Sequence, residues 1–311
     1  MVDAATPLEH AQPALAGGRL LLLKREDRHE LGAFKWRGAL PTLAAYRDRG
    51  ASAVVTASTG NHGAATAWAA QRTGLRAMVF VPEQASLPKL KLMEELGAEL
   101  RHAGADVDEA KDAARAFARE GGLPFFEDGA EDVQFEGYTA IGREIVEQLG
   151  ERPALTVVPV GNGALLIGVA RGLDGGTGSL RAGAPGHGAV GVVSKAAPVM
   201  ALSVRAGRPV ECSQMGTFAD GMAVRVAVPL AVEELVRLGT PFVEVSERAI
   251  ARAVGAFAEA GLRVEGSAGA ALAALDAVEV PEGPVVLVVT GRNIDDELYR
   301  RAVERPESFP G

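Results

Sequence analysis

Short runs of apolar, mostly β-branched residues alternate along the chain with longer stretches rich in alanine, leucine and charged residues. A short apolar run indicates a buried strand, and a longer amphipathic stretch indicates a helix. Their alternation is typical of βαβ units that build a parallel sheet covered on both faces, so the pattern predicts an α/β fold. The strands that we expect are 20–24, 53–56, 76–81, 99–102, 155–159, 190–193 and 285–289.

Two of the expected helices carry clear end signals. Residues 87–97 end at Gly97, a residue suited to the C-terminal cap of a helix. Residues 106–122 place acidic side chains in the first turn and stop at two consecutive glycines. Both segments are amphipathic, so we expect each to cover one face of a sheet.

The composition narrows the class of protein. At 311 residues, 48% hydrophobic and 23% charged, the chain is long enough for two domains with real cores. The formal charge of -8 is spread along the sequence, so we expect neither a nucleic-acid partner nor a membrane partner. The single cysteine, Cys212, excludes a disulfide framework and a Cys-type zinc site. The first ten residues lack the pattern of a signal peptide, so a cytoplasmic location is expected.

The first motif that is a candidate for catalysis is LGAFKWRGA, residues 31–39. Lys35 follows small and apolar residues and opens a predicted helix. Apolar surroundings and the positive end of a helix favour a neutral amine, which can form an imine with an aldehyde cofactor. The alternative is an ordinary solvated surface lysine.

The second motif is TASTGNHG, residues 56–63, between a predicted strand and an alanine-rich helix. Backbone amides and hydroxyls at a helix N-terminus form an anion site that suits a substrate carboxylate. The alternative is a plain turn in which Ser58 or Thr59 caps the helix.

The third motif is VVPVGNGALLIGVARG, residues 157–172, which predicts a buried strand, a glycine turn and a helix. It matches neither a Walker A loop nor G-x-G-x-x-G, so it favours a small phosphate monoester over a nucleotide. The alternative is close packing of the helix on the strand.

The fourth motif is VVLVVTGRNID, residues 285–295, in which a hydrophobic strand ends at Thr290. Ligands of open α/β sheets bind outside the carboxyl ends of the strands, where Thr290 is expected. The alternative is a turn hydroxyl. Glu265, in VEGSAGAALAAL, is either a buried carboxylate or, in the simpler interpretation, a first-turn acid of the next helix. The histidines have no metal-ligand spacing and no G-x-S-x-G elbow is present, so no metal site and no hydrolase triad are predicted.

Each motif is ambiguous alone, but their order is specific. GAFKWRGA, STGNHG, PVGNGALLIG, TFADG, VEGSAGAALAAL and VVTGRNID follow one another along the chain. From Thr6-Pro7-Leu8 almost to the C-terminus, the chain resembles the fold-type-II pyridoxal-phosphate (PLP) enzymes of the tryptophan synthase β superfamily. It is most similar to the threonine/serine dehydratases, while Asn162 and Thr290 resemble threonine synthase.

Four departures from the patterns of the family change what the resemblance implies. Ala33 replaces the usual serine before Phe-Lys, and the glycine loop carries Asn162 and Ala164 where dehydratases prefer glycine. Thr59 stands where serine racemases have a serine, which disfavours racemisation. Gly216 stands where racemase-like members have a cation-binding glutamate, so no metal is expected.

The resemblance also implies roles for individual residues. Lys35 carries PLP as a Schiff base and later moves the Cα proton of the substrate. The residues expected to bind the cofactor are Lys35, Phe34 beside the ring, Asn61 at the ring hydroxyl, Gly161, Asn162, Gly163, Ala164 and Leu165 at the phosphate, and Thr290 at the pyridine nitrogen. The residues expected to bind the substrate carboxylate are Ser58, Thr59, Gly60, Asn61 and His62.

The fold that the resemblance implies consists of two three-layer αβα domains with mostly parallel sheets and PLP in the cleft between them. The larger domain is expected to contain residues 1–39 and 135–311, and the smaller, inserted domain residues 40–134.

The function implied is elimination of the β-hydroxyl of an amino acid to give a 2-oxo acid and ammonia, by a homodimer or larger homo-oligomer. Two alternatives remain open. One is a β- or γ-replacement enzyme of the same family, such as a threonine synthase or a specialised biosynthetic enzyme, and the other is a non-enzymatic binding protein on the same scaffold.

Overall fold

A computed structural model of the chain describes residues 5–85, 87–175, 188–212 and 215–311. The chain divides into two compact units. The larger unit contains Met1–Phe34 and Tyr138–Gly311, and the smaller unit contains Lys35–Gly137. That these units are the two domains expected from the sequence stays a prediction.

The larger unit is built on a six-stranded sheet with the order β1-β2-β9-β6-β7-β8. Only the edge strand β1 is antiparallel to its neighbour. The strands are β1 (Leu8–His10), β2 (Leu21–Arg25), β6 (Leu155–Pro159), β7 (Ala189–Ser194), β8 (Phe242–Val245) and β9 (Val285–Val289). All five residues of β2 and of β9 are buried, because helices cover both faces of the sheet.

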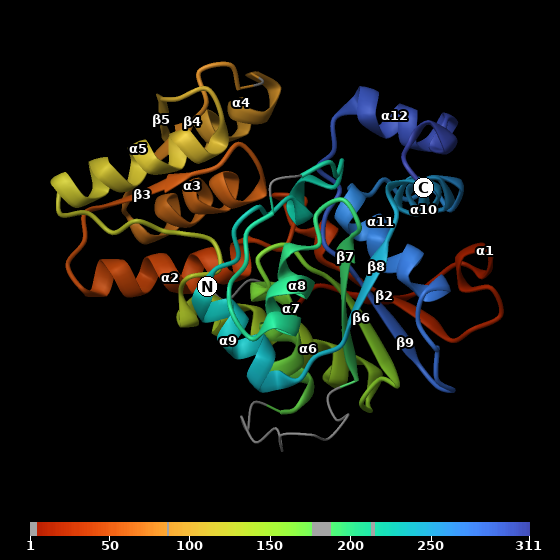
Figure 1. Cartoon of the computed structure of the whole chain (residues 1–311). Helices are drawn as coiled ribbons and strands as arrows, with labels where there is room; N and C mark the ends of the chain where they lie inside the picture. The colour runs from red at the N-terminus through yellow and green to blue at the C-terminus, as the bar shows by residue number, and fades with distance from the viewer. Residues whose placement is uncertain (1–4, 86, 176–187, 213–214) are drawn as a thin grey trace. The chain divides into compact units, whose positions relative to one another are not determined.

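The helices of the larger unit form two layers around this sheet (Figure 1). Helices α10 and α11 contribute Phe257 and Ala271 to a core with Leu23 and Leu287 of the sheet. Helices α6 and α7 lie on the other side (Figure 1) and touch backbone to backbone, since a Cβ on Gly142 would meet Val169 O. The α-helices are α1 (Pro13–Ala16), α6 (Asp132–Leu149, which begins in the smaller unit), α7 (Ala164–Leu173), α8 (Val199–Ala206), α9 (Pro229–Leu238), α10 (Glu247–Glu259), α11 (Gly266–Ala273) and α12 (Asp296–Glu304). The 3-10 turns are η1 (Glu26–Arg28), η2 (Asp220–Met222), η3 (Ala274–Asp276) and η4 (Pro306–Ser308).

The smaller unit is a three-layer sandwich around a parallel sheet of order β3-β4-β5. The strands are β3 (Ala53–Ala57), β4 (Arg76–Val81) and β5 (Glu99–His102), and the helices are α2 (Trp36–Asp48), α3 (Asn61–Thr73), α4 (Leu87–Glu95) and α5 (Val107–Glu120). Helix α5 packs on one face of the sheet through Ala110, Ala114 and Ala118, which recur every four residues. Helices α3 and α4 pack on the other face.

The predicted α/β class with mostly parallel sheets is confirmed. The helix predicted after Asp106 begins with that residue as its cap, whose carboxylate accepts a hydrogen bond from Glu109 N at 2.9 Å. The pattern missed β1 and β8, which are short and only partly buried.

Candidate active site

The larger unit brings two predicted site segments to neighbouring strand ends. Strands β6 and β9 pair in parallel, with Thr156 opposite Val286. The glycine loop 161–165 follows β6, and Thr290 follows β9. Because parallel strands end at the same edge of a sheet, the two segments lie at the carboxyl edge where α/β proteins bind ligands.

The glycine loop forms a strand-to-helix turn with little side chain in it. Gly163 caps helix α7 in the left-handed region, at φ 93°, where glycine is favoured. A Cβ on Gly161 would collide with the carbonyl oxygen of Gly221. The Ala164 N–H donates to Asn162 Oδ1 at 3.1 Å, so an acceptor oxygen lies at the start of the helix. The geometry suits an anion at the positive end of α7.

Thr290 has a buried carboxylate as its partner. Its hydroxyl donates to Glu265 Oε1 at 2.8 Å, and both side chains are buried. Glu265 is the N-cap residue of α11. The interpretation of Glu265 as merely a first-turn acid is therefore incomplete, because its carboxylate is committed to the strand-end threonine.

The segment that leads into Lys35 is fastened to the end of β9. Phe34 N donates to Thr290 O at 3.1 Å, and Asn293 Nδ2 donates to Leu31 O at 2.7 Å. Gly32 has φ 65°, and a Cβ there would lie 2.6 Å from Asn293 Oδ1. The motif TGRNID thus has a structural task that the sequence did not reveal, which is to hold the residues before the lysine. The Phe34 ring packs against Tyr138, with centroids 5.1 Å apart.

The smaller unit contains the lysine and the second of the two loops that are predicted to bind an anion. Lys35 is the N-cap residue of α2, as predicted, and its side chain is 12% exposed. The predicted carboxylate loop, residues 58–62, follows β3, and its helix α3 starts at Asn61 with Gly60 as N-cap. Neither Ser58 nor Thr59 caps the helix, so the simple capping alternative for these residues is wrong.

A carboxylate that the sequence analysis missed contacts the lysine. Asp128 Oδ2 accepts a hydrogen bond from Lys35 Nζ, and Asp128 Oδ1 accepts one from Gln134 Nε2 at 2.6 Å. Asp128 is brought there by the segment 124–126, which lies parallel to β3 through the hydrogen bonds Val55 N to Pro124 O and Phe126 N to Val55 O. Asp128 therefore follows an extended segment at the same end of the sheet as the loop 58–62.

His62 lies beside this pair as a neutral ring. Its Nε2 is 3.2 Å from Phe126 O, which can only accept, so Nε2 carries the proton. Its Nδ1 is 3.7 Å from Asp128 Oδ1, which is too long for a direct hydrogen bond. Burial lowers the pKa of the His62 imidazole below its ordinary value, although Asp128 opposes the shift. His62 is therefore an uncharged neighbour of the lysine and aspartate.

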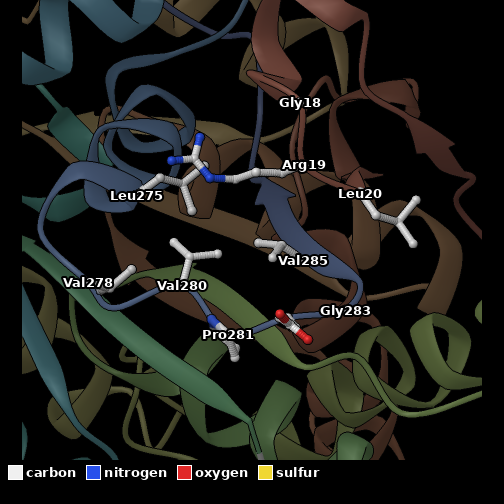
Figure 2. A pocket seen from close by; sticks show the side chains of 10 residues that line it. Gly18, Arg19, Leu20, Leu275, Val278, Val280, Pro281, Gly283 and Val285 are labelled. Atoms are coloured by element: carbon white, nitrogen blue, oxygen red, sulfur yellow. The ribbon is translucent and has the colours of Figure 1, made fainter.

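A hollow in the larger unit lies away from Thr290. It has a volume of about 500 Å³ and is lined by Arg19, Val280 and Val285, among others (Figure 2). Strand β9 begins at Val285, whereas Thr290 follows its other end. This hollow therefore belongs to the amino edge of the sheet and is not the candidate site.

Two absences concern the described residues only. Among them, no group of three or more histidine, cysteine or acidic side chains is placed to hold a metal ion. None of their helices combines the length and the apolar character needed to cross a membrane.

The fold and these groups define a class: a parallel α/β protein with glycine-containing loops at its strand ends and a mostly buried lysine at the start of a helix. The family model described as "Pyridoxal-phosphate dependent enzyme" matches residues 2–291. The chain therefore belongs to the family of pyridoxal-phosphate dependent enzymes, and the predicted family and cofactor are confirmed.

Three similar proteins illustrate this membership. An L-threonine ammonia-lyase of Thermotoga maritima is 33% identical over 297 residues, which are 94% of this chain and 71% of the relative. The processed form of threonine deaminase isoform 2 from Solanum lycopersicum has a TM-score of 0.86 at 27% identity and covers 97% of this chain and 88% of its own. An L-serine ammonia-lyase from the fungus Rhizomucor miehei has a TM-score of 0.83 at 26% identity, with 97% and 98% covered.

The groups present fit PLP chemically. A lysine amine can join the aldehyde, a helix N-terminus can bind a phosphate, and a hydroxyl can meet the ring nitrogen. Ser267 adds an orphaned polar atom, since its buried Oγ has no hydrogen-bond partner among the described residues. Ser267 lies close to the glycine loop through Gly221. A Cβ added to Gly221 would lie 2.8 Å from Ser267 Oγ, and the carbonyl oxygen of Gly221 lies next to Gly161. An unsatisfied hydroxyl beside the glycine loop is consistent with a site built for a polar ligand.

Proposed function

We propose that this enzyme is an ammonia-lyase that removes the β-hydroxyl of threonine or serine and releases a 2-oxo acid and ammonia. The observation that carries the proposal is the Lys35 amine at the N-terminus of α2, in a chain similar to threonine and serine ammonia-lyases. The amino-acid substrate, the homo-oligomeric state and the cytoplasmic location are part of this proposal.

The proposed binding roles follow the chemistry of the side chains. Loop residues Gly161, Asn162, Gly163, Ala164 and Leu165 hold the phosphate through backbone amides and the dipole of α7. Phe34 packs beside the ring, Thr290 meets the ring nitrogen, and Asn61 meets the ring hydroxyl. PLP, when bound, supplies an aldehyde carbon for an amine and a ring that withdraws electrons from the substrate Cα.

The proposed work of the polypeptide is binding, orientation and proton transfer. The amides and hydroxyls of Ser58, Thr59, Gly60, Asn61 and His62 hold the substrate carboxylate at the start of α3. Lys35 Nζ would hold the cofactor and, once the substrate amine has displaced it, would remove the Cα proton. The β-hydroxyl leaves with its bonding electrons, and water converts the released enamine into the 2-oxo acid and ammonia.

A direct assay tests this function. PLP-loaded protein is incubated with L-threonine, L-serine or O-phosphohomoserine, and 2-oxo acid and ammonia are measured separately. We expect equal amounts of both products from at least one hydroxy amino acid. No 2-oxo acid from threonine or serine would contradict the ammonia-lyase, and release of phosphate from O-phosphohomoserine would favour a replacement enzyme instead.

Lys35→Ala tests the assigned lysine. We expect turnover to fall by about a thousandfold or more, because the group that moves the proton is lost, and the visible-edge absorbance of bound PLP to disappear. Lys111→Ala is the matched control, since Lys111 pairs with Glu127 at 2.5 Å instead of reaching Asp128. Full activity in Lys35→Ala would overturn the assignment.

A further inference from the structure

Asp128 is a partly buried anion, with 24% of its side chain exposed, and its position does not depend on Lys35. Gln134, which is fully buried, donates to Asp128 Oδ1 and accepts from Gly129 N at 2.7 Å. The preceding segment is fixed on β3 by Phe126 N donating to Val55 O at 2.8 Å. The carboxylate is therefore held by the smaller unit itself and keeps its place when the lysine moves.

The surroundings keep this group charged. Burial acts to raise the pKa of the Asp128 carboxyl, but the charge of Lys35 and the hydrogen bonds from Lys35 and Gln134 hold this pKa well below its ordinary value. The neutral His62 presents only the Nδ1 lone pair toward Asp128. The neighbourhood of the lysine amine is thus rich in hydrogen-bond acceptors and carries a negative charge.

We propose that Asp128 is a specificity residue that meets the substrate's β-substituent, selecting a hydrogen-bond donor such as hydroxyl and rejecting an anionic group. The inference rests on the proposed function, in which Lys35 Nζ reaches the substrate Cα. Because the Asp128 carboxylate is hydrogen-bonded to Nζ, it then lies close to the substrate Cα and to the β-substituent on the next carbon. A β-hydroxyl can donate to the carboxylate, whereas a carboxylate or phosphate on the substrate meets a like charge at short range.

This assignment narrows the substrate class. Neutral hydroxy amino acids fit, and acidic amino acids and O-phosphorylated amino acids do not. It also gives a physical reason, independent of the relatives, why a phosphorylated replacement substrate suits this site poorly.

The test measures binding ratios on the PLP-loaded enzyme. L-serine, L-aspartate and O-phospho-L-serine are mixed with wild type and Asp128→Asn in a stopped-flow instrument. Apparent dissociation constants are read from the initial change in the cofactor absorbance, before serine is consumed. We expect serine to bind wild type at least about tenfold more tightly than either anionic ligand, because like charges disfavour the wrong partner. In Asp128→Asn we expect this preference to shrink by about tenfold.

Two further variants keep the outcome interpretable. Asp128→Glu retains the charge, so rejection of aspartate should persist even if serine binds less well. Glu127→Gln is the matched control, because Glu127 pairs with Arg115 at 2.8 Å and with Lys111. This variant should prefer serine over aspartate as strongly as the wild type does. Circular dichroism and bound PLP confirm that each variant is folded.

An unchanged serine-to-aspartate ratio in folded Asp128→Asn overturns the inference. So does loss of the preference in Asp128→Glu. These are binding measurements, so they can be read even if the wild type releases no 2-oxo acid. Failure of the proposed function and failure of the Asp128 assignment are therefore distinguishable.

Discussion

The molecule contains two strand-to-helix loops of the same general design, and they differ in how tightly they are built. Loop 161–165 follows β6 in the larger unit, and loop 58–62 follows β3 in the smaller unit. Each leads into a helix whose N-cap is a glycine without a side-chain cap. In the first loop Gly163 is buried, and a Cβ there would lie 2.7 Å from Leu235 Cδ1. In the second, Gly60 is exposed, and a Cβ there would have no atom within 4 Å.

This difference matches two kinds of ligand. A loop that is buried and tightly packed offers a fixed set of amides, which suits a cofactor phosphate that stays bound through many turnovers. A loop with free space at its tip suits a carboxylate that must enter and leave in every cycle. Packing density therefore separates the proposed cofactor loop from the proposed substrate loop, although both are glycine turns before helices.

Among the variants that test this comparison, Gly163→Ala should have the largest effect. Alanine at φ 93° is strained by about 1–2 kcal/mol, and the contact of its methyl group with Leu235 adds about 1–3 kcal/mol. We expect lower stability in urea unfolding and PLP affinity weakened by about tenfold, which corresponds to 1.4 kcal/mol. Absorbance titration with PLP measures the affinity.

Gly207→Ala separates strain from site chemistry. Gly207 has φ 65°, and a Cβ there would touch nothing within 4 Å. The Gly207→Ala variant should be less stable by about 1–2 kcal/mol but should bind PLP with the affinity of the wild type. Equal PLP affinity in both variants would show that the packed loop is not the phosphate site.

A smaller effect is expected from Thr290→Val, which keeps the shape of the side chain and removes its hydroxyl. The buried Glu265 carboxylate loses a donor at 2.8 Å, so we expect about 1–3 kcal/mol less stability in urea unfolding. Thr290→Ser retains the hydroxyl, so its stability should be much closer to that of the wild type. If valine and serine variants are equally stable, the strand end of β9 is not held by this hydrogen bond.

The regular parts of both units could be predicted from the sequence. Strands β4, β5, β6 and β9 have the predicted bounds, because each is a short run bounded by turn residues. Strand β1 escaped because it is a three-residue antiparallel edge, where burial leaves little pattern. The glycine loops were recognisable because their spacing is local.

The partners of the site residues could not be predicted, because they depend on contacts distant in the sequence. Asp128 lies in an acidic stretch that looks like solvated surface, and it meets Lys35 only because segment 124–126 joins β3. Glu265 looks like the first acid of a helix, and its role appears only when Thr290, 25 residues later, is placed beside it. Sequence spacing thus indicated the backbone loops that are proposed to bind ligands, but it did not indicate the carboxylates that contact Lys35 and Thr290.

Gly60→Ala should cause the smallest change in stability, and it is the sharpest test of the comparison between the two loops. Gly60 has φ −126°, which alanine adopts freely. Alanine is a poorer N-cap than glycine but also reduces the entropy of the unfolded chain, so the net change should stay within about 0.5 kcal/mol. The new methyl group occupies open space that the substrate carboxylate is proposed to fill, so KM for threonine or serine should rise severalfold. PLP affinity should not change, because the cofactor phosphate is assigned to the other loop. If Gly60→Ala lowers the affinity for PLP as much as Gly163→Ala does, both loops bind the same ligand. The assignment of phosphate to one loop and carboxylate to the other is then wrong.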